Sequence, residues 1–291
     1  MRIILSGFGV VGQSFAKLLL SRSEDLYAKH GLKPRIVGVF DSKGSAASSA
    51  GLDLNRLLEV KKKYGNIRKY HNKEKDANGL DMINGMDAEV LIETTPSNYK
   101  DAEPGMSHIV SAMKKGLHVI TVNKGPLALA FPSLIELATY NQVQLKFSGT
   151  VGGGTPILDY AKNSLRGERI ISFQGILNGT TNYILTNMAA GLTFKAALVD
   201  ARKKGYVEAD ESLDIDGLDA AAKLVILANW IMDMKVTIKD IKRIGIRDVT
   251  TTDIKNATSS KCAIKLVASC NRELIVCAKK DRENFRLKAR H

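Results

Sequence analysis

Cysteines, aromatic residues and long apolar runs are all scarce in this chain of 291 residues. Its three cysteines, Cys262, Cys270 and Cys277, are an odd number at spacings that match no common zinc or thiol-redox pattern, and a reducing compartment is the simplest setting for them. No apolar run approaches the length of a membrane span, and no export signal follows Met1. We therefore expect a cytoplasmic protein with no membrane partner.

Acidic residues are also in deficit, because 43 basic residues face 30 acidic ones and the formal net charge is +13. A basic surface can bind nucleic acid through the release of counterions from phosphates. Here the excess charge is scattered, and the aromatic residues, 6% of the chain, form no base-stacking motif. We predict no nucleic-acid partner and expect an anionic cofactor and substrate to use part of the charge.

The first half of the chain alternates apolar strand-like runs with helical stretches, which is typical of a parallel sheet covered by helices. This order predicts a doubly wound, Rossmann-type α/β domain, in which ligands collect at the carboxyl ends of the strands. The expected strands are 2–6, 35–40, 88–93, 117–122 and 142–147, and the expected helices are 10–20, 53–64, 105–115 and 131–140.

The second half has longer helices and fewer strands, which predicts an α+β substrate and catalytic domain. We assign residues 1–130 to an NAD(P)-binding domain and residues 131–291 to the second domain, with the transition between about Gly125 and Gly149. The elements expected in the second domain are strands at 169–176, 263–269 and 273–278 and helices at 181–189, 193–204 and 217–232.

A glycine-rich segment follows the first expected strand and opens the first expected helix. It reads Gly7-Phe8-Gly9-Val10-Val11-Gly12. This spacing is the dinucleotide fingerprint, in which the glycines allow a tight turn and a close approach of the backbone. Free N–H groups at the helix start can then hold a pyrophosphate. We predict that all six residues contact NAD(P); a turn needed only for packing is the alternative.

Asp41 ends the second expected strand, where a carboxylate can accept hydrogen bonds from the adenosine ribose and would favour NAD. Lys43 follows closely, and the lysines at 61–63 lie on the next expected helix. Such cations can instead hold the 2′-phosphate of NADP; solvated surface lysines are the alternative. The choice between NAD and NADP stays open at this point.

Two further strands end in polar residues that should border the nicotinamide, because ligands gather at this edge of the sheet. Thr94 and Thr95 follow one strand, and Asn123 and Lys124 follow the other. We predict that all four bind the cofactor. Lys124 is also a candidate catalytic residue, since most lysines lie on exposed helix faces rather than at a strand end.

Asp219 and Lys223 are four residues apart on an expected helix and therefore share one face. The other positions from 220 to 228 are apolar, as in a helix that is buried nearly all round. An exposed ion pair is the alternative to a site. We expect a polar cleft in which Asp219, Lys223 and Glu208 converge, with Lys223 or Lys124 supplying the proton that accompanies hydride transfer. Lys223 should face the nicotinamide across a gap between the two domains.

The substrate has a predictable chemistry. The segment Asn178-Gly179-Thr180-Thr181 opens an expected helix, whose N–H groups suit a carboxylate. Spare acidic residues in the cleft suit an ammonium group. An amino acid or amino aldehyde is therefore the expected substrate.

The chain resembles the homoserine dehydrogenases from residue 1 to about residue 235. The segments that carry the resemblance are 7–12, 41–44, 93–96, 122–124, 150–156, 178–185, 205–208 and 214–223. The resemblance implies reversible NAD(P)-linked reduction of aspartate 4-semialdehyde to homoserine, on the route to threonine, methionine and isoleucine. It also implies a homodimer joined by sheet.

The resemblance assigns roles residue by residue. Lys223 becomes the proton donor and Lys124 a second catalytic lysine near the nicotinamide. Glu208 and Asp219 become substrate contacts, and Asp219 belongs to the catalytic set. Further substrate-binding residues in the matching segments are Tyr206, Gly179, Thr180 and Asp214.

Two departures from the family pattern qualify this interpretation. The family often binds sodium through carbonyls that match Val151, Gly153 and Thr155 together with a glutamate, but Ser148 stands at the glutamate position. The usual C-terminal stretch that returns to the cofactor domain has no recognisable counterpart after Ala278. A catalytically impaired NAD(P)-binding sensor is therefore the alternative function.

Aspartate semialdehyde dehydrogenase is a further alternative, but its chemistry needs a cysteine nucleophile in the cleft. All three cysteines follow Ser260, in a segment that we expect to form peripheral strands. The sequence shows no appended regulatory domain, so feedback control by threonine is not predicted.

Overall fold

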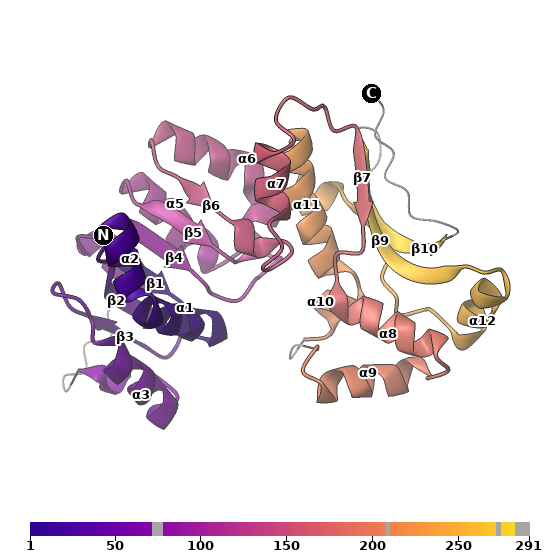
Figure 1. Ribbon diagram of the computed structural model, residues 1–291, viewed down its shortest axis with the longest axis horizontal. Coiled ribbons are helices and arrows are strands. Elements are labelled where there is room, and N and C mark those ends of the chain that lie inside the picture. Colours follow the sequence, from indigo (N-terminus) through magenta and orange to yellow (C-terminus); the bar gives the residue numbers. More distant parts are fainter. Residues whose placement is uncertain (72–77, 208–209, 272–274, 283–291) are drawn as a thin grey trace. The chain divides into compact units, whose positions relative to one another are not determined.

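The computed structural model describes residues 1–71, 78–207, 210–271 and 275–282 (Figure 1). The chain forms two compact units, Met1–Thr150 and Val151–His291, which are described separately. The division falls later than the boundary predicted at residue 130. The reason is that β6 (Leu145–Lys146) pairs in parallel with β5 (His118–Thr121) and so completes the first sheet.

The first unit is built on a six-stranded sheet in the order β3-β2-β1-β4-β5-β6. All neighbours in this sheet pair in parallel except β3, which runs antiparallel to β2. The predicted doubly wound α/β domain is thereby confirmed. The other strands are β1 (Arg2–Ser6), β2 (Arg35–Asp41), β3 (Gly44–Ala47) and β4 (Val90–Glu93).

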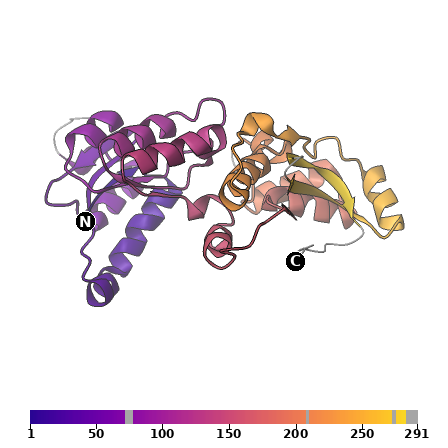
Figure 2. The same cartoon turned by 90° about the horizontal axis from the view of Figure 1, so that it is seen from above.

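Helices lie on both faces of this sheet, with α1 on one side and α5 and α6 on the other (Figure 2). Strands β1, β2 and β4 are almost wholly buried, as expected for parallel strands covered on both faces. The helices are α1 (Val10–Ser21), α2 (Ser23–His30), α3 (Leu54–Tyr64), α4 (Gly79–Gly85), α5 (Gly105–Lys114) and α6 (Lys124–Tyr140), with short 3₁₀ turns at Arg68–Tyr70 and Ser148–Thr150.

Helix α6 is kinked at Ala130, whose φ of −148° and ψ of 35° are not helical, so the predicted helix 131–140 is the part after the kink. The part before the kink begins at Lys124 and was not predicted; Pro126 is tolerated in its first turn because the missing N–H would be unpaired there anyway. Asn123 caps the helix by accepting a hydrogen bond from the Gly125 N–H at 2.9 Å. Lys124 is thus fixed at a helix start directly above the end of β5.

The second unit has a four-stranded sheet in the order β7-β9-β10-β8. Strand β9 pairs antiparallel with β7 and β10, and β8 pairs in parallel with β10. The strands are β7 (Ser172–Gly175), β8 (Lys242–Arg243), β9 (Ala263–Asn271) and β10 (Ile275–Arg282). The helices are α7 (Ile157–Asn163), α8 (Gly179–Ala189), α9 (Phe194–Lys203), α10 (Ser212–Ile215), α11 (Leu218–Met232) and α12 (Thr251–Ser259), with a 3₁₀ turn at Ile238–Asp240.

Helix α11 forms the centre of the second core. Ten of its fifteen residues are buried, including Leu224 and Val225 at 0% exposure. The run Ala220-Ala221-Ala222 leaves room for neighbouring elements to pack closely against its first turns. This confirms that Lys223 is surrounded by apolar, buried positions between 220 and 228. Within the described part of the chain, no helix is long and apolar enough to cross a membrane.

Candidate active site

The glycine turn after β1 is required by the fold at two of its three glycines. Gly7 has a φ of +87°, and a Cβ there would lie 2.8 Å from the Thr94 main chain. A Cβ at Gly12 would lie 2.3 Å from the Gly7 carbonyl oxygen. The Gly7 N–H also donates to the Phe40 carbonyl at 2.8 Å. These contacts hold the tight turn after β1 against the ends of β2 and β4.

Gly9 has no such internal reason to be glycine. Its φ of −81° suits any residue, and a Cβ built there meets nothing within 4 Å. Its position is the N-cap of α1, where no side chain of the described residues caps the helix and no acidic residue occupies the first turn. An open space above uncapped N–H groups fits a pyrophosphate. The residues present therefore suit a dinucleotide cofactor.

The neighbours of these glycines divide into two kinds. Phe8 is 0% exposed and packs in the core of the first unit, so only its main chain can meet a ligand. Val10 and Val11 are exposed by 83% and 48% at the start of α1. Of the predicted cofactor segment, the valine side chains and Gly9 are therefore the parts open to a ligand.

Asp41 at the end of β2 already has two partners. Its Oδ1 accepts from the Lys43 N–H at 2.7 Å, and its Oδ2 lies 2.5 Å from Lys61 Nζ. The Asp41 and Lys61 side chains are only 11% and 15% exposed. The predicted acid and one lysine of the predicted basic run are thus brought together, so this corner carries an ion pair rather than a bare carboxylate.

The ends of β4 and β5 are linked by side-chain hydrogen bonds. The Thr94 hydroxyl donates to the Gly7 carbonyl at 2.8 Å, which attaches the glycine turn to β4. Asn123 Nδ2 donates to the Thr95 hydroxyl at 3.1 Å, which joins the loops after β4 and β5. The Lys124 N–H donates to Ser97 Oγ at 3.0 Å. All four predicted residues at this edge lie in one connected group.

A second polar cluster lies in the other unit, where α8 begins. Asn178 is 4% exposed and caps α8 by accepting from the Thr181 N–H at 2.8 Å. Its Nδ2 donates to Asp214 Oδ1 at 2.6 Å and to Asp219 Oδ2 at 2.9 Å. One asparagine therefore holds two carboxylates beside a helix N-terminus.

Lys223 completes this cluster. Its Nζ lies 2.6 Å from Asp219 Oδ2 and 2.9 Å from the Leu177 carbonyl oxygen. The Lys223 and Asp219 side chains are 19% and 13% exposed, so this ion pair is mostly shielded from solvent. An ammonium group has three N–H bonds, and these contacts use two of them.

Asp214 differs electrostatically from a surface carboxylate. Burial raises its pKa, and the nearby Asp219 charge raises it too, while the hydrogen bond from Asn178 acts in the opposite direction. Two carboxylates and one lysine in a sheltered site leave an excess of negative charge. Such a site can bind a cationic group.

Comparisons with known proteins bear on both units. The family model described as "Homoserine dehydrogenase, NAD binding domain" matches residues 7–148, and that described as "Homoserine dehydrogenase" matches residues 156–288. The chain is 44% identical over 268 residues to a homoserine dehydrogenase of Methanocaldococcus jannaschii, covering 92% of this chain and 80% of that protein. The chain belongs to the homoserine dehydrogenase family. Its activity is accordingly that of an NAD(P)-dependent oxidoreductase.

Other homoserine dehydrogenases agree. An "NAD(+)-dependent homoserine dehydrogenase" of Pseudomonas canavaninivorans is 37% identical and covers 93% of this chain and 77% of its own length. The solved structure of a putative homoserine dehydrogenase from Archaeoglobus fulgidus matches with a TM-score of 0.87 and 36% identity over 97% of this chain and 84% of that one. A hyperthermophilic archaeal homoserine dehydrogenase in complex with NADPH matches with a TM-score of 0.83 and 27% identity over 97% and 82%.

The remaining predicted substrate-binding residues that the structure describes lie near the start of α8. Thr180 is buried and donates from its hydroxyl to the Tyr206 carbonyl at 2.8 Å, and Gly179 is the first residue of α8. The Tyr206 side chain is 53% exposed. Glu208 lies outside the described residues. The described members thus surround the start of α8.

Three residues lie in segments that the sequence singled out, but the contacts that they make were not predicted. Asn178 could have been recognised, because an asparagine before a helix is a typical N-cap. Lys61 could not be assigned to Asp41, since nothing in a run of surface lysines indicates which one turns inward. Glu93 is 0% exposed at the end of β4, although a glutamate in a strand gives no sign that it is buried.

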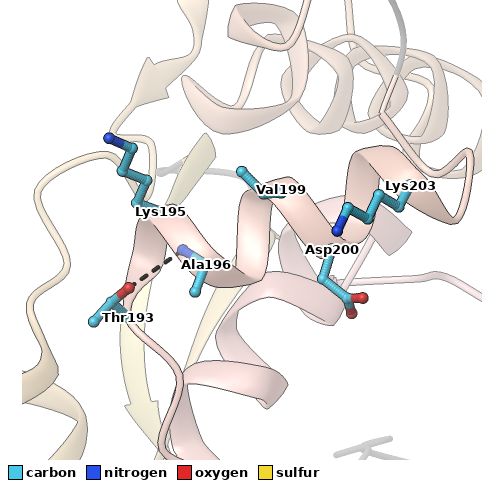
Figure 3. A pocket seen from close by; sticks show the side chains of 6 residues that line it. All are labelled: Thr193, Lys195, Ala196, Val199, Asp200 and Lys203. Atoms are coloured by element: carbon cyan, nitrogen blue, oxygen red, sulfur yellow. Dashed lines mark hydrogen bonds between the residues drawn. The ribbon is translucent and has the colours of Figure 1, made fainter.

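A surface pocket lies elsewhere in the second unit, on the outer side of α9 (Figure 3). Its lining comes from that helix and its N-cap alone, which makes it a helix surface rather than an enclosed cavity. None of the predicted site residues contributes to it. The lining residues are Thr193, Lys195, Ala196, Val199, Asp200 and Lys203.

Proposed function

We propose that this chain catalyses the reversible reduction of L-aspartate 4-semialdehyde to L-homoserine, with Lys223 giving a proton to the carbonyl oxygen. The observation that carries this assignment is the Lys223 amine held at 2.6 Å from Asp219 and 2.9 Å from the Leu177 carbonyl on a helix that is apolar at the other positions from 220 to 228. Those two contacts fix the direction of the amine and leave one N–H for a substrate oxygen.

The chemistry requires a hydride at carbon and a proton at oxygen. The bound nicotinamide supplies or accepts the hydride. Lys223 donates the proton during reduction and accepts it during homoserine oxidation, as a positioned general acid or base. Asp219 holds the lysine in place, and Lys124, fixed at the start of α6, acts as the second lysine near the nicotinamide.

Substrate recognition follows from the charges around α8. The carboxylates of Asp214 and Asp219, together with Glu208, bind the substrate ammonium group. Gly179 and Thr180 at the start of α8, with Tyr206, bind its carboxylate through N–H groups and the helix dipole. This arrangement selects an amino acid over a simple hydroxy acid.

The test is an absorbance assay at the band of the reduced nicotinamide, with L-homoserine and 4-hydroxybutyrate as paired substrates. We expect turnover of homoserine and a loss of about a hundredfold or more in kcat/KM for 4-hydroxybutyrate, because the ionic contacts of the ammonium group with the carboxylates are lost. Equal rates for the two compounds would contradict the proposed recognition of the amine.

We propose that NADP is preferred over NAD, because the Lys61 ammonium group already neutralises Asp41 at the ribose corner and the Lys43 N–H occupies its other oxygen. Replacing Lys61 with methionine should raise the Kd for NADP about tenfold, since an ionic hydrogen bond to the 2′-phosphate is lost. The Kd for NAD should change by less than about threefold. Titration calorimetry measures both, and the exposed neighbour Lys62→Met is the matched control. A parallel loss for both cofactors in Lys61→Met would argue against the assignment.

We also propose a homodimer joined through the sheet of the second unit. Alternate β9 residues, including Ile264 and Leu266, face the core, whereas Ser172, Gln174 and Asn271 lie exposed on the opposite face. Sedimentation should give about twice the chain mass of 31.7 kDa, and a single-chain mass at micromolar concentration would exclude a stable dimer.

We also propose a cytoplasmic location and a sodium site. The cytoplasmic location agrees with the three cysteines, which are free thiols. Sodium binding through the carbonyls of Val151, Gly153 and Thr155 stays a prediction without a carboxylate ligand at Ser148, and no step of the reaction depends on it. The absence of bound sodium in an elemental analysis of the protein purified in sodium buffer and desalted would remove it.

A further inference from the structure

Glu93 is a completely buried carboxylate that the proposed reaction does not use. It ends β4 with 0% exposure. Its Oε1 accepts from the Thr95 N–H at 2.9 Å and from the Thr95 hydroxyl, and its Oε2 accepts from the Thr121 hydroxyl at 3.0 Å. No ion pair reaches it among the described residues. Burial raises its pKa, and these hydrogen bonds oppose the rise.

Asn123 determines the direction of the two hydroxyl groups. The Asn123 N–H donates to Thr121 Oγ1 at 3.0 Å, and Asn123 Nδ2 donates to Thr95 Oγ1 at 3.1 Å. Each hydroxyl oxygen therefore accepts one hydrogen bond from Asn123, and its own O–H group donates to Glu93. Both Glu93 oxygens act as acceptors in this arrangement, which suits an ionised carboxylate.

The same asparagine caps α6. Its Oδ1 accepts from the Gly125 N–H at 2.9 Å, and its Nδ2 also reaches the Pro96 carbonyl at 3.3 Å. Glu93 thus orders, through Thr95 and Thr121, the residue that fixes the start of the helix carrying Lys124. The ends of β4 and β5 are held together by one buried negative charge.

The position of this charge relative to the cofactor follows from the strand order. Strands β2 and β4 lie on opposite sides of β1. A dinucleotide held at the glycine turn after β1, with its adenosine half at Asp41, would place its nicotinamide half toward the ends of β4 and β5. A nicotinamide ring is cationic when oxidised and neutral when reduced.

We propose that Glu93 is a positioning residue that also discriminates between the two redox states of the cofactor. Its carboxylate holds Asn123 and the start of α6 through the two threonines, and its charge favours the cationic, oxidised ring. This inference rests on the placement of the nicotinamide within the proposed function, but it does not depend on the role of Lys223.

The test compares Glu93→Gln with Glu103→Gln, which makes the same change at an exposed glutamate of the same unit. Glutamine keeps the shape and one acceptor oxygen, so the thermal unfolding midpoint should stay within a few degrees of the parent. The ratio of Kd for the oxidised cofactor to Kd for the reduced cofactor should rise about tenfold in Glu93→Gln, as expected for removal of one buried negative charge near the ring. Glu103→Gln should leave the ratio unchanged.

A purely structural role would change both Kd values by the same factor, and that result in a folded Glu93→Gln protein would overturn the redox assignment. Thr121→Val tests the positioning separately, because it deletes one relay hydroxyl and keeps the charge and the β-branched shape. We expect a fall of about tenfold in kcat with an unchanged Kd ratio. Parental kcat in Thr121→Val would overturn the relay, whether or not Glu93→Gln folds. Both Kd values are measured without turnover. A wrong redox assignment for Glu93 is therefore distinguishable from a wrong assignment of the proposed reaction.

Discussion

Replacing Lys223 with alanine is expected to lower kcat by about 10² to 10⁴, the range that a positioned proton donor typically contributes. The amine that lies 2.6 Å from Asp219 would be gone, and alanine offers no group to replace it. The Kd for the cofactor should stay within about twofold, because the dinucleotide turn lies in the first unit. Steady-state rates with homoserine and a cofactor titration measure the two quantities.

Lys239→Ala is the matched control, because Lys239 is exposed in the same unit and touches none of the site residues. It should retain parental kcat. A Lys223→Ala protein that is folded, binds cofactor and turns over homoserine at the parental rate would refute the proposed proton donor.

Alanine at Gly9 and alanine at Gly12 are expected to have opposite consequences. At Gly12 the new Cβ would lie 2.3 Å from the Gly7 carbonyl oxygen, so the turn must move and stability should fall by about 1–3 kcal/mol. At Gly9 the Cβ meets no protein atom within 4 Å, so stability should be preserved while the methyl group occupies the space for the pyrophosphate. We expect a Kd for the cofactor raised by about tenfold or more in Gly9→Ala, since each 1.4 kcal/mol is a factor of ten.

Thermal unfolding and cofactor titration on both variants separate these effects. A stable Gly9→Ala protein with parental cofactor affinity would mean that the open space above α1 does not hold the pyrophosphate. A Gly12→Ala protein of parental stability would mean that the turn can relax around the added carbon.

The parallel sheet was predictable because its strands are short, apolar and separated by helical stretches. Strand β3 was missed, since Gly44–Ala47 contains only small residues and no alternation of polar and apolar side chains. Helix α12 was also missed, because its mean composition is polar, although Thr250 and Asp253 form a capping box that could have marked its start. Elements such as these, which lack a periodic pattern of apolar residues, are harder to predict from the sequence than elements that have one.

The site was predictable where both partners lie on one helix. Asp219 and Lys223 are four residues apart, and the salt bridge between them follows from helical geometry alone. The bridge from Asn178 to Asp214 spans 36 positions, and that from Lys61 to Asp41 spans 20. Contacts between distant elements depend on how the elements pack, and no local pattern encodes that.

The most direct test of the central claim is a single-turnover experiment on Lys223→Ala with saturating cofactor and homoserine, with and without methylamine. Saturation removes binding from the observed rate, so the formation of reduced nicotinamide reports the chemical step. We predict a rate reduced by about a hundredfold or more, partly restored by methylamine acting as a replacement for the lost amine. A single-turnover rate equal to that of the parent, with no response to methylamine, would contradict the account.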